Sequence, residues 1–577
     1  MSGFAVSRWL GQSARPLGQL AVACCLRGEV HRVCDVGRGS VAPPRERSLK
    51  LAIDLLSAVP SGPLQRSAIL WRANTSWCER PDRLSRAVLA AFPYGTGFLA
   101  AVAASAARYP RAAAVATSDQ CVSYRGLWRG SGALAGALKR RGVGSADRVG
   151  ILCRNSPTFV YALLAVAMVG ADIVLLNTAM GGSQLADVIA AENVTTVLHD
   201  DDFGAVVSVI AGVHTLDATG MRAIVEDRPL EWVEPPERDS RLVILTSGTT
   251  GRPKGASRST ASGAHGVASV LASIPFRLRD RTVVAAPFFH GWGLAALLTC
   301  LGLSGSVFTA PEFDAGEVLS LLSSHRAHGL VLVPTMLQRI CALPPAQLAR
   351  ADTENLRVIA SSGSALPGRL ATEALDRFGQ ILYNVYGSTE VAAATIARPA
   401  DLRRDPATAG RPALGVRVEV LSEHGAPVPP GTVGRICVNS KARYDGYTGG
   451  AGRDVVAGLI STGDLGYFDD RGRLFVVGRE DDMIVSGGEN VYPSEIEDLL
   501  NTDDRVGEAV VVGIDDDQFG QALKAVVVIA AGQQVSAQEL KELIANRLAR
   551  FKVPRVFEFV DALPRNATGK VLRRQLV

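Results

Sequence analysis

Helical patterns and short apolar runs alternate along the chain from Tyr124 onward. LADVIAAEN is followed by TTVLHD, and LLSSHRAHG is followed by LVLVP, so each helical stretch leads into an apolar strand. Strands that are apolar at every position are buried on both faces, as in a parallel sheet covered by helices. The pattern therefore predicts an α/β fold with a largely parallel sheet system.

The longest apolar run, FVYALLAVAMVGADIVLL, extends from Phe159 to Leu176 and approaches the length of a membrane span. Gly170 and Asp172 interrupt it. We therefore predict a buried helix followed by a buried strand, and not a transmembrane helix.

The pattern changes twice in the last third of the chain. Beyond Arg411, VRVEVLSEHGAPVPPGTVGRICVNS predicts short strands joined by Gly and Pro turns, and hence a small antiparallel or barrel-like subdomain. After GREDDMI, Pro493 opens a helix, EAVVVGI and LKAVVVIA predict strands, and Ser536 with Glu539 forms a capping-box pattern. These elements predict a compact α+β unit of about a hundred residues.

The chain of 577 residues is too long for one hydrophobic core. We expect a poorly ordered N-terminal extension over residues 1–85, a large multi-sheet α/β domain with the small β-barrel-like subdomain over 86–480, and a small, mobile α+β C-terminal domain over 481–577. The first 28 residues carry three Arg and no acid, but their apolar patch is too short to favour a targeting peptide.

Composition excludes several classes of function. The composition, 47% hydrophobic and 20% charged, is that of an ordinary globular protein, and a net charge of +5 over this length does not favour a nucleic-acid partner. The nine cysteines show no C-x-x-C pair, and Cys153, Cys300 and Cys437 lie in apolar runs where a thiol is a small buried hydrophobe. We expect a reducing, cytoplasmic setting.

The stretch LTSGTTGRPKG, residues 245–255, favours a polyphosphate ligand. Small residues let backbone N–H groups approach anionic oxygens, hydroxyl groups donate hydrogen bonds, and Lys254 supplies a positive charge. It is not a Walker A loop, because Lys254 lies between Pro253 and Gly255. We expect Lys254 on a flexible loop, since the residue before a proline avoids helical dihedrals.

Four further stretches carry weaker signals. YGSTE places Thr389 beside Glu390, a pair suited to a phosphate and a hard cation, and STGDLGYFDD offers an Asp that could accept hydrogen bonds from ribose hydroxyls. GRED offers an Arg suited to phosphate or ribose, and LPRNATGKVLRR offers a Lys after a Gly. Each alone is also compatible with a solvated side chain or a turn cap.

These stretches, together with SSGSAL, occur in an order that resembles the adenylate-forming superfamily of acyl-CoA synthetases, luciferases and nonribosomal adenylation domains. The resemblance covers about residues 90 to 577, and GYTGG and DVVAGLISTGDLG are most similar to bacterial fatty-acid CoA ligases. SSGSAL differs from the commoner SGGAPL, so Ser362 adds a hydroxyl beside the expected adenine edge.

The resemblance implies a role for each matching residue. The loop expected to hold the β- and γ-phosphates comprises Thr246, Ser247, Gly248, Thr249, Thr250, Gly251 and Lys254. The residues expected around adenine are Gly363, Ser364, Ala365, Tyr386 and Gly387. The remaining implied residues are Thr389 at the α-phosphate, Glu390 at Mg²⁺, Asp464 and Arg479 at the ribose, Asp481 as the hinge, Gly488 in the coenzyme A tunnel, and Lys570 between the substrate carboxylate and the α-phosphate. His290, in FFHGWG, corresponds to a position near the acyl pocket, although a packed loop histidine explains it nearly as well.

The implied activity is ATP- and Mg²⁺-dependent activation of a carboxylic acid to acyl-AMP, followed by transfer to coenzyme A. A medium- or long-chain fatty acid is the expected substrate, because GWGLAALLTCLGLSGSVF would suit an alkyl tunnel, although it would equally suit a plain core. Three alternatives stay open at this point: an acyl-AMP ligase that loads a carrier protein, a non-catalytic lipid-binding or uptake protein, and a peripheral membrane protein anchored by the N-terminal segment.

Overall fold

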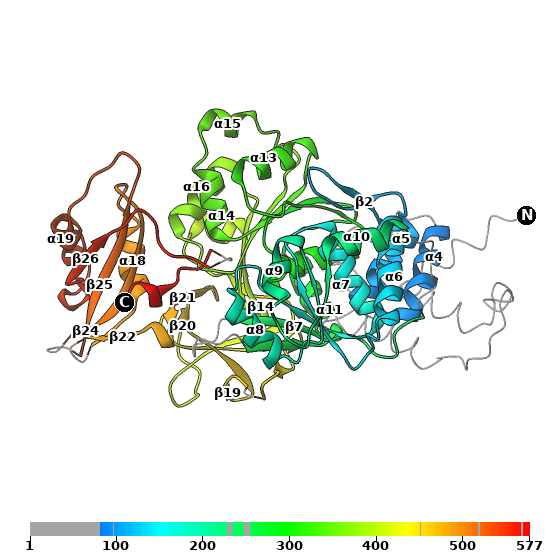
Figure 1. Ribbon diagram of the computed structural model, residues 1–577. Helices are drawn as coiled ribbons and strands as arrows, with labels where there is room; N and C mark the ends of the chain where they lie inside the picture. Colours follow the sequence, from blue (N-terminus) through cyan, green and yellow to red (C-terminus); the bar gives the residue numbers. More distant parts are fainter. Residues whose placement is uncertain are drawn as a thin grey trace, which may run out of the picture.

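The computed structural model describes residues 81–95, 97–227, 234–246, 254–450, 452–486, 489–516, 520–566 and 569–577. Figure 1 shows a large body of sheets and helices, with a smaller C-terminal unit, coloured orange to red, at the end opposite α4 (Pro81–Ala91), α5 (Phe98–Arg108) and α6 (Tyr124–Arg140). Residues 81–85, which the sequence assigns to the N-terminal extension, form the first turns of α4, where Pro81 fits the first helical turn because its missing N–H would be unpaired there.

Two sheets dominate the large body. The first is parallel in its centre with antiparallel strands at both edges, and the second is parallel except at one edge. The first has the spatial order β15 (Arg411–Pro412), β14 (Ala392–Ala397), β13 (Leu382–Ser388), β12 (Val358–Ser361), β11 (Gly329–Leu332), β9 (Arg281–Val284), β10 (Ser306–Phe308), β1 (Ala113–Ala116) and β2 (Cys121–Ser123). The second has the order β18 (Gly446–Tyr447), β8 (Lys254–Arg258), β7 (Leu242–Thr246), β4 (Asp172–Leu175), β3 (Arg148–Leu152), β5 (Thr196–His199) and β6 (His214–Asp217).

Helices cover these sheets, as the alternating pattern predicts. In chain order, beyond α4 to α6, they are α7 (Pro157–Val169), α8 (Gly182–Ala191), α9 (Gly204–Val207), α10 (Ala218–Asp227), α11 (Thr260–Ser273), α12 (Gly291–Gly302), α13 (Ala315–Ser324), α14 (Pro334–Cys341), α15 (Pro345–Arg350), α16 (Gly368–Phe378) and α17 (Pro399–Arg404). None of the helices in the described part of the chain is long and apolar enough to span a bilayer.

The apolar run from Phe159 to Leu176 is a buried helix and strand, as predicted. Ser156 caps α7 by accepting a hydrogen bond from the Phe159 N–H, and Gly170 ends it in the left-handed region at φ 86°. Strand β4 follows at once and pairs in parallel with β3 and β7. Nearly all of α7 is buried in the main hydrophobic core, which explains why no amphipathic pattern marks it.

Two smaller sheets complete the fold. An antiparallel sheet contains β16 (Val416–Leu421), β17 (Gly434–Ser440), β19 (Val455–Val456), β20 (Leu459–Phe468) and β21 (Leu474–Arg479), and it is the subdomain predicted beyond Arg411. The C-terminal unit contains β22 (Ile484–Ser486), β23 (Glu489–Val491), β24 (Val506–Asp516), β25 (Gly520–Ile529) and β26 (Val556–Phe559), with α18 (Pro493–Leu500) and α19 (Ala537–Arg547) packed on a core of their own. The predicted capping box of Ser536 and Glu539 is present at α19.

Two local predictions have clear outcomes. Cys153, Cys300 and Cys437 are buried free thiols, as their apolar surroundings predicted. The prediction of a flexible loop at Lys254 is wrong, because Lys254 begins β8 and pairs with Thr246 in an antiparallel hairpin. On its other side β8 pairs with β18, which lies about 190 residues later in the sequence. The local Gly and Pro pattern does not reveal this long-range pairing.

Candidate active site

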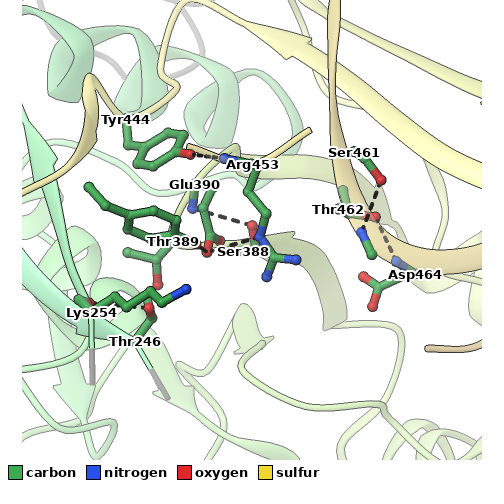
Figure 2. A network of polar contacts seen from close by, with 12 residues as sticks. Thr246, Lys254, Ser388, Thr389, Glu390, Tyr444, Arg453, Ser461, Thr462 and Asp464 are labelled. Atoms are coloured by element: carbon green, nitrogen blue, oxygen red, sulfur yellow. Dashed lines mark hydrogen bonds and ion pairs between the residues drawn. The ribbon is translucent and has the colours of Figure 1, made fainter. Parts of the chain in front are cut away.

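A large cavity of about 2480 Å³ opens where the parallel strands of the two main sheets end. Its walls include Thr246 at the end of β7, Val333 after β11, Ser362 after β12 and Tyr386 near the end of β13. Ligand sites of α/β proteins commonly lie at the carboxyl ends of parallel strands, because loops and helix starts converge there. Residues of the antiparallel subdomain and of the C-terminal unit close the cavity, and Figure 2 shows its polar centre.

The β7–β8 hairpin carries Lys254 to the cavity wall. The Thr246 hydroxyl donates a hydrogen bond to the Lys254 carbonyl oxygen at 3.2 Å, and the Lys254 ammonium lies 5.7 Å from the ring centroid of Tyr447. The predicted phosphate-loop residues Ser247, Gly248, Thr249, Thr250 and Gly251 lie outside the described residues, as does Gly488. Thr246 and Lys254 mark the two ends of that loop.

A buried carboxylate, Glu192, supports the hairpin from behind. Its Oε1 accepts a hydrogen bond from the Thr448 hydroxyl at 2.7 Å, and its Oε2 pairs with Arg148 at 3.3 Å. A Cβ on Gly255 would lie 2.3 Å from the same Oε1. Glycine is therefore needed beside Lys254 so that this carboxylate can pack against the strand.

Glu390 lies at the centre of the polar network. The carboxylate is 4% exposed, accepts a hydrogen bond from the Tyr447 hydroxyl at 2.5 Å, and lies 3.5 Å from Nε of Arg453. Burial alone would raise the pKa of Glu390, but the Tyr447 hydrogen bond, then Ser388 and the charge of Arg453, lower it below its usual value. The group is therefore a carboxylate at neutral pH.

Arg258 braces the turn that carries Thr389 and Glu390. One of its terminal nitrogens donates to the Thr389 carbonyl oxygen, while its buried Nε has no hydrogen-bond partner among the described residues. Burial lowers the pKa of Arg258 to about 10, against the opposing charges of Glu390 and Asp445. At neutral pH this is a buried positive charge directly behind the turn.

The predicted ribose residues form a second network. Asp464 accepts a hydrogen bond from the Tyr386 hydroxyl at 2.6 Å and one from Arg479 Nη1 at 3.1 Å, and Nη2 of Arg479 lies 3.5 Å from Asp481. Burial raises the pKa of Asp464, while Tyr386 and then the charges of Arg479, Arg453 and Lys570 oppose that shift. The Asp464 carboxylate is thus bound by Tyr386 and Arg479. It does not cap its own turn, which was the alternative interpretation from the sequence.

The predicted adenine wall follows β12 and faces the cavity. It comprises Gly363, Ser364 and Ala365, with Tyr386 and Gly387 on β13. Gly363 has φ +98°, a conformation that other L-residues rarely adopt. Ser362 donates its hydroxyl hydrogen to the Val385 carbonyl at 2.7 Å, so this departure from the commoner sequence ties two strands together. Packing also requires glycine at position 387, because a Cβ there would lie 1.9 Å from the Ala392 carbonyl oxygen.

Lys570 reaches the same cavity from the C-terminal unit. Its loop is held by hydrogen bonds in both directions with Asn566, and it approaches α14 so closely that a Cβ on Gly569 would lie 2.1 Å from the Thr335 hydroxyl oxygen. The Lys570 side chain is exposed, yet desolvation by the surrounding protein, followed by the charge of Arg479, lowers its pKa against the opposing charges of Asp482 and Asp464. The structure therefore brings Lys570 to the ribose network.

One stretch of the cavity wall, here called the apolar arm, is formed by α12 and α5. It includes His290 just before α12, Trp292, Leu294 and Leu298 of α12, and Ala101 of α5. Burial lowers the pKa of His290 to about 4, and its Nε2 has no hydrogen-bond partner among the described residues. The imidazole is therefore neutral, and it both borders the cavity and packs against the ring of Phe289 at 4.4 Å between centroids, so the acyl-pocket role and the packed-histidine alternative both stay open.

The donor set around Glu390 fits a magnesium ion that is shared with a polyphosphate. Among the described residues no group of three or more His, Cys, Asp or Glu side chains could hold a metal alone. Mg²⁺ characteristically takes one or two carboxylates and completes its shell with phosphate oxygens and water. Glu390 offers one ionised carboxylate at the cavity wall. One carboxylate is enough for a magnesium ion that is also bound by phosphate oxygens, but not for a site made of protein ligands alone.

Four residues of the site escaped sequence analysis: Glu192, Arg258, Tyr447 and Arg453. Each acts through a partner distant in sequence, so no local spacing marks it. Tyr447 carried the only usable signal, because GYTGG formed part of the resemblance.

Comparisons with known proteins identify the family of the chain. Residues 102–448 match the model of the AMP-binding enzyme family, and residues 495–570 match the AMP-binding enzyme C-terminal domain. A feruloyl-CoA synthase of Amycolatopsis is 34% identical over 81% of this chain and 96% of its own. A fatty acid–[acyl-carrier-protein] ligase, ScoC of Streptomyces coeruleorubidus, is 32% identical over 81% of this chain and 93% of its own.

A solved structure is similar over the same range. The o-succinylbenzoate CoA synthetase of Bacillus subtilis, in complex with its acyl-adenylate intermediate, is 29% identical, with a TM-score of 0.74 over 82% of this chain and 97% of its own. The α/β fold with a large N-terminal part and a small C-terminal part, expected from the sequence, is thereby confirmed. The chain belongs to the AMP-binding enzyme family of the adenylate-forming superfamily, and it is a ligase that activates a carboxylic acid through an adenylate.

Proposed function

We propose that this protein converts a medium- or long-chain fatty acid to acyl-AMP with ATP and then transfers the acyl group to coenzyme A. The observation that carries the proposal is the continuity of the cavity. The same cavity is lined by Lys254, Glu390, Asp464 and Lys570 and by the apolar side chains of α12. A polyanion and a long apolar acid could therefore meet within it.

The first step faces an electrostatic obstacle, because a carboxylate must approach the anionic α-phosphate. In the proposed reaction a carboxylate oxygen attacks the α-phosphorus, the bond to the β-phosphate oxygen breaks, and pyrophosphate leaves. Asp464 and Arg479 hold the ribose, Lys254 holds the outer phosphates, and Lys570 neutralises charge between the two reactants. Mg²⁺, bound by Glu390 and phosphate oxygens, would neutralise charge on the pyrophosphate that leaves.

The second step uses the same carbonyl carbon with a different nucleophile. The thiol sulfur of coenzyme A attacks the carbonyl, the bond to the AMP oxygen breaks, AMP leaves and the thiol proton passes to solvent. Lys570 must withdraw to admit the thiol, and rotation of residues 481–577 about Asp481 would move it. Asp481 lies in the 3₁₀ turn Glu480–Asp482, between strands of two different sheets.

The length of α12, which forms much of the apolar arm, supports an extended acid. α12 has twelve residues, which at 1.5 Å per residue gives about 18 Å. A chain lying along it would contact Trp292 first, then Leu298, and finally Gly302 beside Ala101. The relatives named for feruloyl-CoA and o-succinylbenzoate make aryl acids the second candidate class, and the relative named as a carrier-protein ligase makes a carrier protein the second candidate acceptor.

The deciding experiment is a substrate panel with purified full-length protein. Saturated fatty acids of increasing length and aryl acids would be incubated with ATP, Mg²⁺ and either coenzyme A or a phosphopantetheinylated carrier protein, and acyl-AMP and thioester would be detected by mass. We expect acyl-CoA from fatty acids. Turnover confined to aryl acids would refute the substrate class, thioester only on the carrier would refute the acceptor, and no AMP release with any acid would refute the function.

A further inference from the structure

Arg453 occupies the gap between the two polar networks, and no role is implied for it by the motifs of the sequence. Its Nε lies 3.5 Å from Glu390. Its charge also acts on Asp464, where it helps to offset the rise in pKa that burial causes. Figure 2 shows its guanidinium directed into the open centre of the site, between Glu390 and Asp464 and on the side from which Lys254 approaches.

The surroundings fix Arg453 in this position. Its backbone N–H donates to the Tyr444 hydroxyl at 2.8 Å, and the ring of Tyr444 packs edge-on against Tyr447, which donates to Glu390. A Cβ on Gly463 would lie 3.0 Å from Nη1 of Arg453 and 3.1 Å from Nη2 of Arg479. The missing side chain of Gly463 therefore leaves room for two guanidinium groups that flank the same point.

Each of the two guanidinium groups lies beside a carboxylate, Arg479 beside Asp464 and Arg453 beside Glu390, and together they form a cationic point on the cavity wall that would suit an anionic ligand. Asp464 pairs with Arg479 through a hydrogen bond at 3.1 Å, whereas Arg453 meets Glu390 at 3.5 Å through Nε and also interacts with the Tyr447 hydroxyl. The terminal nitrogens of Arg453 are the donors that fit a phosphate in a bidentate manner. Arg453 thus lies between the proposed ribose residue and the proposed metal ligand, where the α-phosphate of a nucleotide would be.

We propose that Arg453 binds the α-phosphate directly and does so in both half-reactions. This inference rests on the proposed function. Lys570 belongs to the C-terminal unit and would leave after adenylation, whereas Arg453 lies between β18 and β19 of the large body and would stay. When the carbonyl–oxygen bond of acyl-AMP breaks, negative charge returns to the phosphate of AMP. Arg453 is the cation that stabilises this leaving group while Lys570 is away.

The test measures nucleotide binding without turnover and without metal. Full-length wild-type protein and Arg453→Gln would be titrated calorimetrically with AMP and with adenosine in the presence of EDTA. Loss of a charge-assisted hydrogen bond typically costs about 1.5–3 kcal/mol, which is about a 10- to 100-fold loss of affinity. We expect that loss for AMP, little change for adenosine, and partial recovery with Arg453→Lys. Arg443→Gln is the matched control, because Arg443 is exposed in the same segment outside the cavity.

A double-mutant cycle separates phosphate binding from a merely structural role. If Arg453 acted only by holding Glu390, then Arg453→Gln would have no further effect on AMP affinity in a Glu390→Gln background. We expect the loss to persist there, and we expect Arg453→Gln to slow both pyrophosphate exchange and thioester formation from acyl-AMP. Unchanged AMP binding, equal effects on AMP and adenosine, or loss of the effect in the Glu390→Gln background would overturn the inference. Failure of the wild type to bind ATP or AMP would instead refute the proposed function, and the inference with it.

Discussion

The pKa of Lys570 depends on the residues around it in the folded chain. Desolvation by the surrounding protein and the charge of Arg479 disfavour its protonated form, so its pKa is lowered from the ordinary value of 10.5. Asp464 and Asp482 favour the charge and limit the shift. A sequence motif could identify this lysine, but the shift depends on residues that come near it only in the folded chain.

The pH dependence of adenylation should therefore report on Lys570. Because a lowered pKa means that the proton is lost at lower pH, we expect kcat/KM for ATP to fall on the alkaline side before an ordinary lysine would titrate. Lys570→Arg should retain some activity and lose this alkaline decline, since arginine stays protonated. Pyrophosphate exchange across pH would measure both profiles. If the alkaline decline in activity were identical in the wild type and Lys570→Arg, the group that titrates would not be Lys570.

At the scale of elements, the hairpin of β7 and β8 illustrates what sequence patterns can and cannot predict. The apolar strand before the loop was predictable from its composition, as were α7 and β4 with Gly170 between them. Strand β8 was not, because it is defined by pairing with β18 and by Glu192 packed against Gly255. Likewise Asp464 was recognisable from its motif, but its bonds to Tyr386 and Arg479 join three strands.

Substitution of Gly255 tests this support. In Gly255→Ala the new Cβ would lie 2.3 Å from Oε1 of Glu192 and 2.7 Å from Val243, so β8 must shift and move Lys254. We expect the KM for ATP to rise about tenfold and the protein to lose about 1–3 kcal/mol of unfolding free energy. Steady-state kinetics and urea unfolding measure the two effects. Gly144→Ala is the control, because its Cβ would lie 3.9 Å from Asp147; an equal effect there would contradict the argument.

The apolar arm offers a second test at this scale. Ala101 of α5 faces the end of α12, where a Cβ on Gly302 would lie 3.6 Å from the Ala101 Cβ. Ala101→Phe should fill the end of the arm, so that kcat/KM for the longest accepted fatty acid falls about tenfold or more while a shorter acid is used as before. Equal losses for both acids would mean that the arm does not hold the acyl chain.

At the scale of the whole molecule, the arrangement of the two parts is the one that we propose for the first half-reaction. The Lys570 loop contacts the large body at Thr335, and Asp464 and Lys570 interact electrostatically across the boundary. Figure 1 shows the last segment of the chain, in red, reaching from the C-terminal unit toward the large body. Such an arrangement cannot be inferred from sequence, which indicates that two parts exist but not how they face each other.

Restricting the connection should separate the two steps. In Asp481→Pro the ring fixes φ near −65°, which the 3₁₀ turn at this position accepts, while rotation away from it is hindered. We expect adenylation to stay within about threefold of wild type and thioester formation from purified acyl-AMP to fall at least tenfold. Asp481→Ala removes the contact with Arg479 and leaves rotation free, so it should retain the second step. Unimpaired thioester formation in Asp481→Pro would exclude this residue as the hinge.

The most direct test of the account is the effect of Lys570→Ala on each half-reaction, measured as carboxylate-dependent exchange of pyrophosphate into ATP and as thioester formation from supplied acyl-AMP. We predict that exchange falls about a hundred- to a thousandfold, while ATP binding and the second step are nearly unchanged, because the lysine acts only where carboxylate and phosphate meet. Equal exchange in the wild type and Lys570→Ala would contradict the account.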